Sequence, residues 1–198
     1  QNILEIPGGI DSSWLSAGDT KQPSAPVRFV YLGRYERRKG IEELQTAIQA
    51  NLNWRTSANF RFIGPIPESH RLSLSHVSYA GSIRDDLLLK RELQHADVLL
   101  CPSHSEGMPN VILEGMACGL AIIGTDVGAV RLLVDNHNGV LLSKSKVASI
   151  AHGIEHILSL DAATIKAMQQ TSLTRARLFS WDCIAKRTLD AIEHITAA

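Results

Sequence analysis

Short apolar runs alternate with helical patterns along most of this chain, and this alternation restricts the possible folds more than any other feature. The runs are four to seven residues long and continuous, as is typical of strands buried on both faces of a parallel sheet. They lie at residues 27–33, 59–64, 77–80, 98–101, 121–124 and 139–142, and helical patterns separate them at 41–49, 68–74, 86–95 and 109–118. Repeated strand–helix units predict an α/β fold with a Rossmann-like, doubly wound parallel sheet.

The chain divides into three parts. After Leu142, apolar residues at three- and four-residue spacing predict C-terminal helices at 146–158, 162–178 and 181–195. We expect the last of these helices to pack away from the sheet. Residues 16–26 are rich in Ser, Pro, Gly and Asp, which is typical of a linker or long loop. We therefore expect a linking segment at 1–25, a Rossmann-like domain at 26–180 and a C-terminal helix at 181–198.

The composition excludes several classes of protein. With 44% hydrophobic residues and 20 Lys and Arg against 20 Asp and Glu, the chain has a globular composition and no net charge. It lacks the basic character of a nucleic-acid-binding domain, and it has no apolar run long enough to span a membrane. Its three cysteines lie far apart, so we expect neither disulfides nor a zinc site. We therefore expect a reducing, cytoplasmic setting.

The loop after the first predicted strand is a candidate phosphate site, because ligands of open α/β sheets bind beyond the carboxyl ends of the strands. It carries four cations within residues 34–39 and a glycine at each end, Gly33 and Gly40. The guanidinium of Arg34 and the ammonium of Lys39 both suit phosphate oxygens. A solvated basic loop would have the same composition, but the position at a strand end favours phosphate binding.

The loop after the fourth predicted strand leads into a helix with well-marked ends. Pro109 at the first helical position and Gly119 past the last are typical of helix boundaries. Met108 cannot cap this helix, so first-turn N–H groups such as that of Asn110 stay available to water or an anion. Glu114 has apolar neighbours on its helix face, which indicates a partner for its carboxylate; a partly exposed helix charge is the alternative.

Three further features stay open on the residues alone. Glu106 lies in the loop before that helix, so its carboxylate and that of Glu114 can point into one cleft. The loop at 126–130 could offer N–H groups to a ligand or be a simple turn. His152, Glu155 and His156 fit the H-x-x-E-H pattern of zinc peptidases, but a glycine interrupts the helix and no third ligand is evident, so we expect no metal site.

Four segments of the chain resemble those of a known family, in the same order. Residues 6–11 (IPGGID) are similar to its I-P-N-G-I-D segment, and residues 32–40 to its G-R-x4-K-G loop. Glu106 and Glu114 match its Glu-x7-Glu signature, and residues 138–142 and 179–181 match later landmarks. The chain thus resembles the C-terminal, donor-binding domain of the family 4 retaining glycosyltransferases, which place two Rossmann-like domains across a cleft in the GT-B architecture.

The resemblance implies a role for each candidate residue. Arg34 and Lys39, beside Gly33, would bind the diphosphate of a nucleoside-diphosphate (NDP) sugar, Glu114 the ribose hydroxyls, and Glu106, the catalytic candidate, hydroxyls of the transferred sugar. The rest of the donor site would come from Gly107, Met108, Pro109 and Asn110. These residue types suit the chemistry, because cations stabilise a leaving diphosphate and a carboxylate accepts two hydroxyl protons. The reaction would proceed by same-face attack through an oxocarbenium-like transition state, with no metal and no cofactor.

The resemblance also implies a second domain. The acceptor, a glycan or lipid-linked sugar of polysaccharide biosynthesis, would bind an N-terminal domain preceding Gln1, joined through the segment at 1–25. The nucleotide-sugar-binding domain at 26–180 would then bind its donor without transferring the sugar. The full-length protein would be cytoplasmic, either free or peripheral to the inner face of the membrane, and would bind no nucleic acid.

Two departures from the family pattern keep other functions in view. Gly9 stands where the family usually has Asn, which we interpret as minor. Residues 128–132 lack the family's Gly-Gly pair and following Glu, which leaves the donor-sugar contacts there unassigned. The alternatives are a non-catalytic nucleotide-binding module, or another GT-B enzyme such as a sugar-nucleotide epimerase or a phosphorylase. The changes at residues 128–132 are the only hint of the first, and the intact Arg34, Lys39, Glu106 and Glu114 argue against it. For the others we can assign no further acid or base group and no cofactor lysine.

Overall fold

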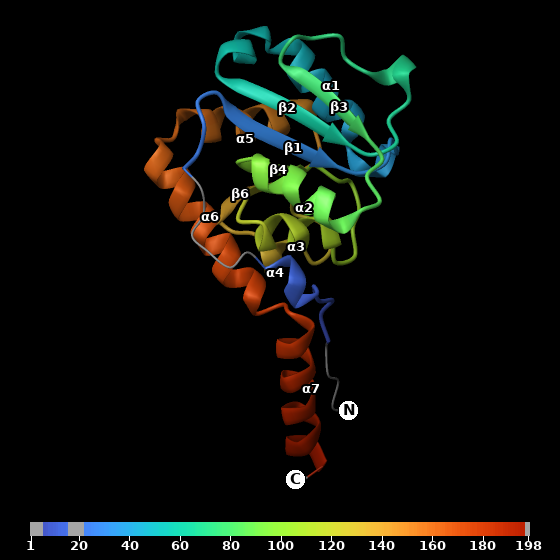
Figure 1. Ribbon diagram of the computed structural model, residues 1–198, viewed down its shortest axis with the longest axis vertical. Coiled ribbons are helices and arrows are strands. Elements are labelled where there is room, and N and C mark those ends of the chain that lie inside the picture. The colour runs from blue at the N-terminus through green and yellow to red at the C-terminus, as the bar shows by residue number, and fades with distance from the viewer. Residues whose placement is uncertain (1–5, 16–21, 197–198) are drawn as a thin grey trace.

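Six parallel strands form one sheet, described here from a computed structural model that covers residues 6–15 and 22–196 (Figure 1). The sheet order is β3-β2-β1-β4-β5-β6, so the direction of winding reverses between β1 and β4. The strands are β1 (Val27–Leu32), β2 (Ala58–Ile63), β3 (Val77–Gly81), β4 (Val98–Cys101), β5 (Ala121–Thr125) and β6 (Gly139–Leu142). This order confirms the predicted Rossmann-like, doubly wound sheet. Residues 16–21 of the expected linker lie outside the described residues.

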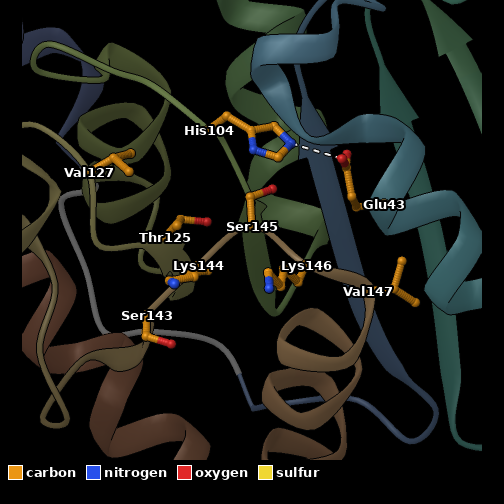
Figure 2. Close-up of a pocket in the computed structure, with 9 residues that line it drawn as sticks. All are labelled: Glu43, His104, Thr125, Val127, Ser143, Lys144, Ser145, Lys146 and Val147. Atoms are coloured by element: carbon orange, nitrogen blue, oxygen red, sulfur yellow. Dashed lines mark hydrogen bonds and ion pairs between the residues drawn. The ribbon is translucent and has the colours of Figure 1, made fainter.

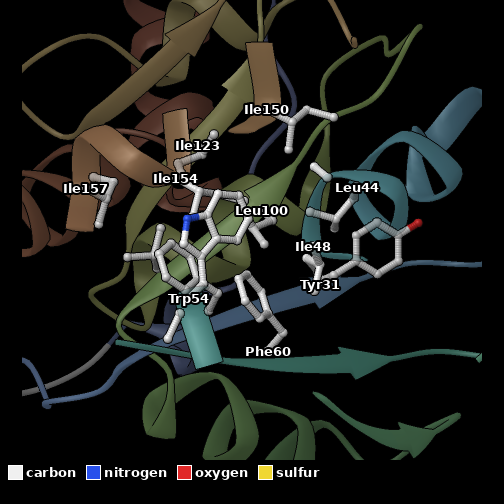
Figure 3. Packing of buried hydrophobic residues seen from close by; sticks show 14 of the residues in the cluster. Tyr31, Leu44, Ile48, Trp54, Phe60, Leu100, Ile123, Ile150, Ile154 and Ile157 are labelled. Carbon is white, nitrogen blue, oxygen red and sulfur yellow. The ribbon is translucent and has the colours of Figure 1, made fainter. Parts of the chain in front are cut away.

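Helices cover both faces of the sheet. They are α1 (Ile41–Ala50), α2 (Asp86–His95), α3 (Asn110–Ala117), α4 (Val130–Leu133), α5 (Val147–Ser159), α6 (Ala162–Arg177) and α7 (Trp181–Thr196). Successive residues of a strand point to opposite faces, so Phe29 and Tyr31 enter one core while Val30 enters the other. Figure 3 shows the first core, where Trp54 and Phe60 pack among isoleucines of α5. The second core lies under α2, α3 and α6.

One predicted helix is wrong. Residues 68–74 form only a short 3-10 helix, η4 (Glu68–His70), followed by extended chain. Leu72 and Leu74 both pack half-buried against the first core. Side chains two positions apart point in nearly opposite directions on a helix, whereas in an extended chain they lie on the same face. The Leu72 N–H also donates to Tyr79 Oη at 2.8 Å, which fixes this extended path.

The segment before β1 meets the residues just before α7 beside the domain. Ile10 is buried and forms an isolated parallel bridge with Ser180: its N–H donates to Phe179 O at 2.9 Å, and its carbonyl accepts from the Trp181 N–H at 3.0 Å. From Trp181 onward, α7 extends away from the body, as expected (Figure 1). Residues 6–15 therefore pack against the domain before the first strand begins.

Candidate functional site

Two loops from neighbouring strands meet where the winding of the sheet reverses. The loop after β1 carries Lys39, the loop after β4 carries Glu106, and Lys39 Nζ lies 2.6 Å from Glu106 Oε1. Both side chains are largely buried, at 16% and 7% exposure. Gly40 makes this approach possible: its φ is 66°, and a Cβ there would lie 1.9 Å from Pro102 O. An open α/β sheet binds its ligands at this position.

Glu106 is held by several donors. Ser103 Oγ donates to Glu106 Oε1 at 2.7 Å, and Arg38 Nη1 lies 3.8 Å from Oε2. These contacts fix the position of the Glu106 side chain. Sequence reasoning missed both partners. Ser103 stands three residues before Glu106, just past β4, and Arg38 adjoins Lys39, so their positions at strand ends were the available signal.

Arg34 stands apart from the Lys39–Glu106 pair. It is 64% exposed, and its Nε lies 2.9 Å from Glu36 Oε1. Glu36 also accepts from Arg38 Nε at 3.1 Å, so charges of alternating sign connect Arg34 to Glu106. The start of this loop is fixed by the backbone, because the Gly33 N–H donates to Ile63 O at 2.9 Å and Tyr31 Oη donates to Arg34 O at 3.0 Å.

The start of α3 has no side-chain cap, as predicted. Pro109 is the N-cap residue and not the first helical residue, so the helix begins one position later than predicted, at Asn110. The backbone forces this shift: Pro109 has extended torsion angles, and its carbonyl accepts the first helical bond, from the Ile112 N–H at 3.0 Å. The exposed Asn110 and the uncapped first turn leave a partial positive charge here.

Glu114 lies one turn into α3, half-buried. Burial raises the pKa of its carboxyl, and the nearby negative charge of Asp86 raises it further. In the described part of the chain, no hydrogen bond or ion pair satisfies this side chain. A partly buried carboxylate with no partner is costly, so this position favours a ligand that donates hydrogen bonds.

The loop after β5 packs against the loop that carries Glu106. The Ala129 N–H donates to Gly107 O at 2.8 Å. Gly128 has a φ of 54°, and a Cβ there would lie 2.0 Å from Glu106 O. The segment before β1 also contacts the loop that carries Glu106, because the Gly8 N–H lies 3.0 Å from Met108 Sδ. The turn ends in the short helix α4, in which Leu132 is exposed.

A cavity of about 570 Å³ lies at the same edge of the sheet, beyond β5 and β6 (Figure 2). Thr125 ends β5, the segment 143–147 leads from β6 into α5, and Glu43 belongs to α1. His104 Nε2 and Glu43 Oε1 are 2.8 Å apart across its rim. None of the predicted donor-site residues lines this cavity.

The H-x-x-E-H residues of α5 do not converge. The side chains of His152, Glu155 and His156 are all exposed. Within residues 6–15 and 22–196, no three His, Cys, Asp or Glu side chains are grouped to bind a metal ion. In the same residues, no helix is both long and apolar enough to cross a bilayer.

Comparison with known proteins identifies a family. Residues 26–160 match the family described as glycosyl transferases group 1. TuaC of Bacillus subtilis (strain 168), assigned to teichuronic acid biosynthesis as a glycosyltransferase, is 34% identical over 125 residues, 63% of this chain and 31% of TuaC. The first curated relatives are longer proteins, of which the chain spans 31% to 57%.

Solved structures share the fold. The C-terminal domain of the glycosyl transferase group 1 protein LpcC from Francisella tularensis superposes with a TM-score of 0.70 at 21% identity, covering 85% of this chain and 97% of that one. HepE of Anabaena, solved in complex with UDP and glucose, has a TM-score of 0.68 at 18% identity, covering 84% of this chain and 48% of that one. The chain therefore belongs to the glycosyl transferases group 1 family, as a domain of the C-terminal type in the GT-B architecture.

Proposed function

We propose that this domain binds the NDP-sugar donor of a retaining glycosyltransferase, in the crevice between the loops after β1 and β4. The observation that carries the proposal is the Lys39–Glu106 pair, at 2.6 Å, where the winding of the sheet reverses. HepE, a protein of the same fold, was solved with UDP and glucose, which supports a nucleoside diphosphate as the ligand class.

The diphosphate would bind between Lys39 and the uncapped start of α3. An ammonium has three N–H donors, and Lys39 uses one on Glu106, so the others stay available to phosphate oxygens. Arg34 is exposed and would have to turn from Glu36 toward the ligand. Two cations and a helix N-terminus supply the positive charge that a leaving diphosphate needs, so we propose binding without a metal.

The two glutamates would take different hydroxyls. Glu114 has no protein partner in the described chain and would accept the ribose hydroxyls. Lys39 and Ser103 both contact Oε1 of Glu106. Among the described residues only Arg38, at 3.8 Å, approaches Oε2, which would therefore accept a hydroxyl of the transferred sugar. Glu106 would thus orient the sugar while the acceptor attacks from the face that the diphosphate leaves.

The acceptor would be held by a second domain of the longer protein. The relatives that match this chain extend well beyond it, which supports a partner domain across the cleft. We propose a glycan or lipid-linked sugar as the acceptor, and we propose that this chain alone does not transfer the sugar.

Calorimetry with UDP, GDP and ADP in the presence of a chelator tests the proposal. We expect saturable binding of at least one of the three nucleotides, with affinity unchanged when magnesium is added. Absence of binding for all three would overturn the donor-site assignment, and binding that needs magnesium would overturn the metal-free part.

A further inference from the structure

The cavity beyond β5 and β6 is distinct from the proposed donor site, since it shares none of its residues. Its volume of about 570 Å³ falls in the range of small-molecule sites. Figure 2 shows Thr125, Ser143 and Lys144 at one side of the cavity, Glu43 and Val147 at the other, and Ser145 between them. The lining includes both positive and negative groups, and two of its polar atoms have no hydrogen-bond partner among the described residues.

Thr125 has a polar atom that the protein does not satisfy. The residue is 1% exposed, and its Oγ1 has no hydrogen-bond partner among the described residues. Figure 2 shows this hydroxyl turned toward Ser145, across the cavity. The Ser145 hydroxyl is already engaged, because it donates to Pro102 O. A buried hydroxyl without a partner costs stability, which a ligand oxygen placed here would offset.

The segment that leads from β6 into α5 is positive. Val147, the first residue of the 13-residue helix α5, lines it, and Lys146 is the N-cap residue with no side-chain cap. The first turn of α5 has no acidic residue to balance the helix dipole. Lys144 and Lys146 both line the cavity and are exposed. Two ammonium groups at a helix N-terminus favour an anion, and phosphate above all.

Glu43 accepts hydrogen bonds at the rim of the cavity. Glu43 Oε1 lies 2.8 Å from His104 Nε2, while Glu43 Oε2 is buried with no partner among the described residues. A carboxylate oxygen in this position binds a hydroxyl group and repels a second anion. The complementary ligand therefore has an anionic group at one end and hydroxyl groups at the other.

We propose that this cavity binds a small hydroxylated phosphate monoester, that is, a sugar phosphate or polyol phosphate. The phosphate lies against Thr125, Lys144, Lys146 and the start of α5, and the hydroxyl groups reach Glu43. Because the site uses none of the donor-site residues, it is independent of the proposed donor binding.

Titrations of the protein saturated with UDP, followed by NMR, test the site. The probes are glucose 6-phosphate, inorganic phosphate, glucose and glucuronate. We expect glucose 6-phosphate to bind more tightly than inorganic phosphate, and glucose and glucuronate to bind far more weakly. Binding of inorganic phosphate alone would indicate an adventitious ion only, and equal binding of glucuronate would exclude phosphate selectivity; either result would overturn the proposal.

Two variants locate the binding. Lys144→Met combined with Lys146→Met should lower the affinity for glucose 6-phosphate by about tenfold or more. The control Lys186→Met, on α7, should leave this affinity unchanged. Thr125→Val should weaken it by about fivefold without lowering the melting temperature, since the hydroxyl makes no bond within the described chain. Unchanged affinity in both cavity variants, or loss of glucose 6-phosphate binding when UDP saturates the protein, would overturn the site. UDP affinity, measured separately on each variant, reports on the donor site alone.

Discussion

Lys39 and Glu106 form an ion pair in a largely buried position. Removing water from a single charge is costly, and a partner at 2.6 Å with a further hydrogen bond from Ser103 offsets that cost. The pair thus satisfies both side chains without a ligand. In the proposed binding mode a diphosphate would use the remaining donors of Lys39, and we expect its affinity to depend on the charge and on the fixed position of Lys39.

Lys39→Met removes the ammonium and keeps most of the side-chain volume. We expect this variant to lower the affinity for the best-binding nucleoside diphosphate by about 10- to 150-fold, which corresponds to the loss of one charged hydrogen bond. The melting temperature should also fall, because Glu106 loses its closest cation. Calorimetry and thermal unfolding measure the two effects. Arg37→Met is the matched control, since Arg37 lies exposed in the same loop, and an equal loss of affinity there would show that only net charge matters.

Glu114, the proposed ribose contact, lowers the stability of the fold at neutral pH. Burial, and then Asp86, raise the pKa of its carboxyl above the ordinary value of 4.5. Between that value and the raised one, the folded protein binds more protons than the unfolded chain. The free energy of unfolding therefore falls as pH rises through this window, and the loss is complete above the folded pKa.

Glu114→Gln should remove this pH dependence and make the protein slightly more stable at neutral pH. The variant should also lower the affinity for ribonucleotides more than that for 2′-deoxyribonucleotides, because the amide is a weaker acceptor for the ribose hydroxyls. Thermal unfolding across pH and paired titrations with UDP and dUDP test this, with Glu155→Gln on the exposed face of α5 as control. Equal losses for both nucleotides would show that Glu114 does not contact the ribose.

Among the elements, the loops at the carboxyl edge are held together by backbone contacts. Gly40 lies against Pro102 O, Gly128 lies against Glu106 O, and the Ala129 N–H donates to Gly107 O. These contacts leave no room for a Cβ, and they set the position of the loop that carries Glu106. The site geometry is therefore coupled to the loop after β5, which contributes no charged group to the Lys39–Glu106 pair.

Gly128→Ala should disturb this arrangement. Its φ of 54° is unfavourable for alanine, and the new Cβ would lie 2.0 Å from Glu106 O. We expect a loss of about 1–3 kcal/mol in the free energy of unfolding, from strain and displacement, and weaker nucleotide binding. Denaturant titration measures the first effect. In the control Gly107→Ala the Cβ would meet nothing within 4 Å, so comparable destabilisation there would refute the packing argument.

At the scale of the whole molecule, the sequence predicted the fold well because the strands are continuous apolar runs with clear ends. The predicted helix at 68–74 was wrong because Leu72 and Leu74 follow the two-residue period of an extended chain. Site residues found by their motifs, Lys39 and Glu106, do lie together. Their partner Ser103 was missed because it depends on how the loop folds back on itself.

The cavity beyond β5 and β6 was not predicted either, for a related reason. Its lining comes from four separate parts of the chain, around residues 43, 104, 125 and 143–147. No spacing within the sequence brings such segments together. Only the order of the strands places the ends of β5 and β6 beside the first turn of α1.

The isolated chain is expected to bind its donor and to show no significant sugar transfer. Orientation of both reactants is worth up to about 7–11 kcal/mol of barrier lowering, and we propose that it requires a partner domain that holds the acceptor. Transfer is assayed with the best-binding NDP-sugar and a mixture of glycan acceptors, then repeated with the natural preceding domain joined at Gln1. Robust transfer by the chain alone would contradict this expectation, and activity of the fusion that disappears in Glu106→Ala would support it.

The bridge between Ile10 and Ser180 has a mechanical consequence. The two segments run in the same direction, so tension applied between residue 6 and α7 pulls them along their length in opposite senses. Both hydrogen bonds of Ile10 then carry the load at once, as in shear, and cannot open one after the other as in unzipping. The bridge acts as a clamp that shields the sheet from forces transmitted along the chain.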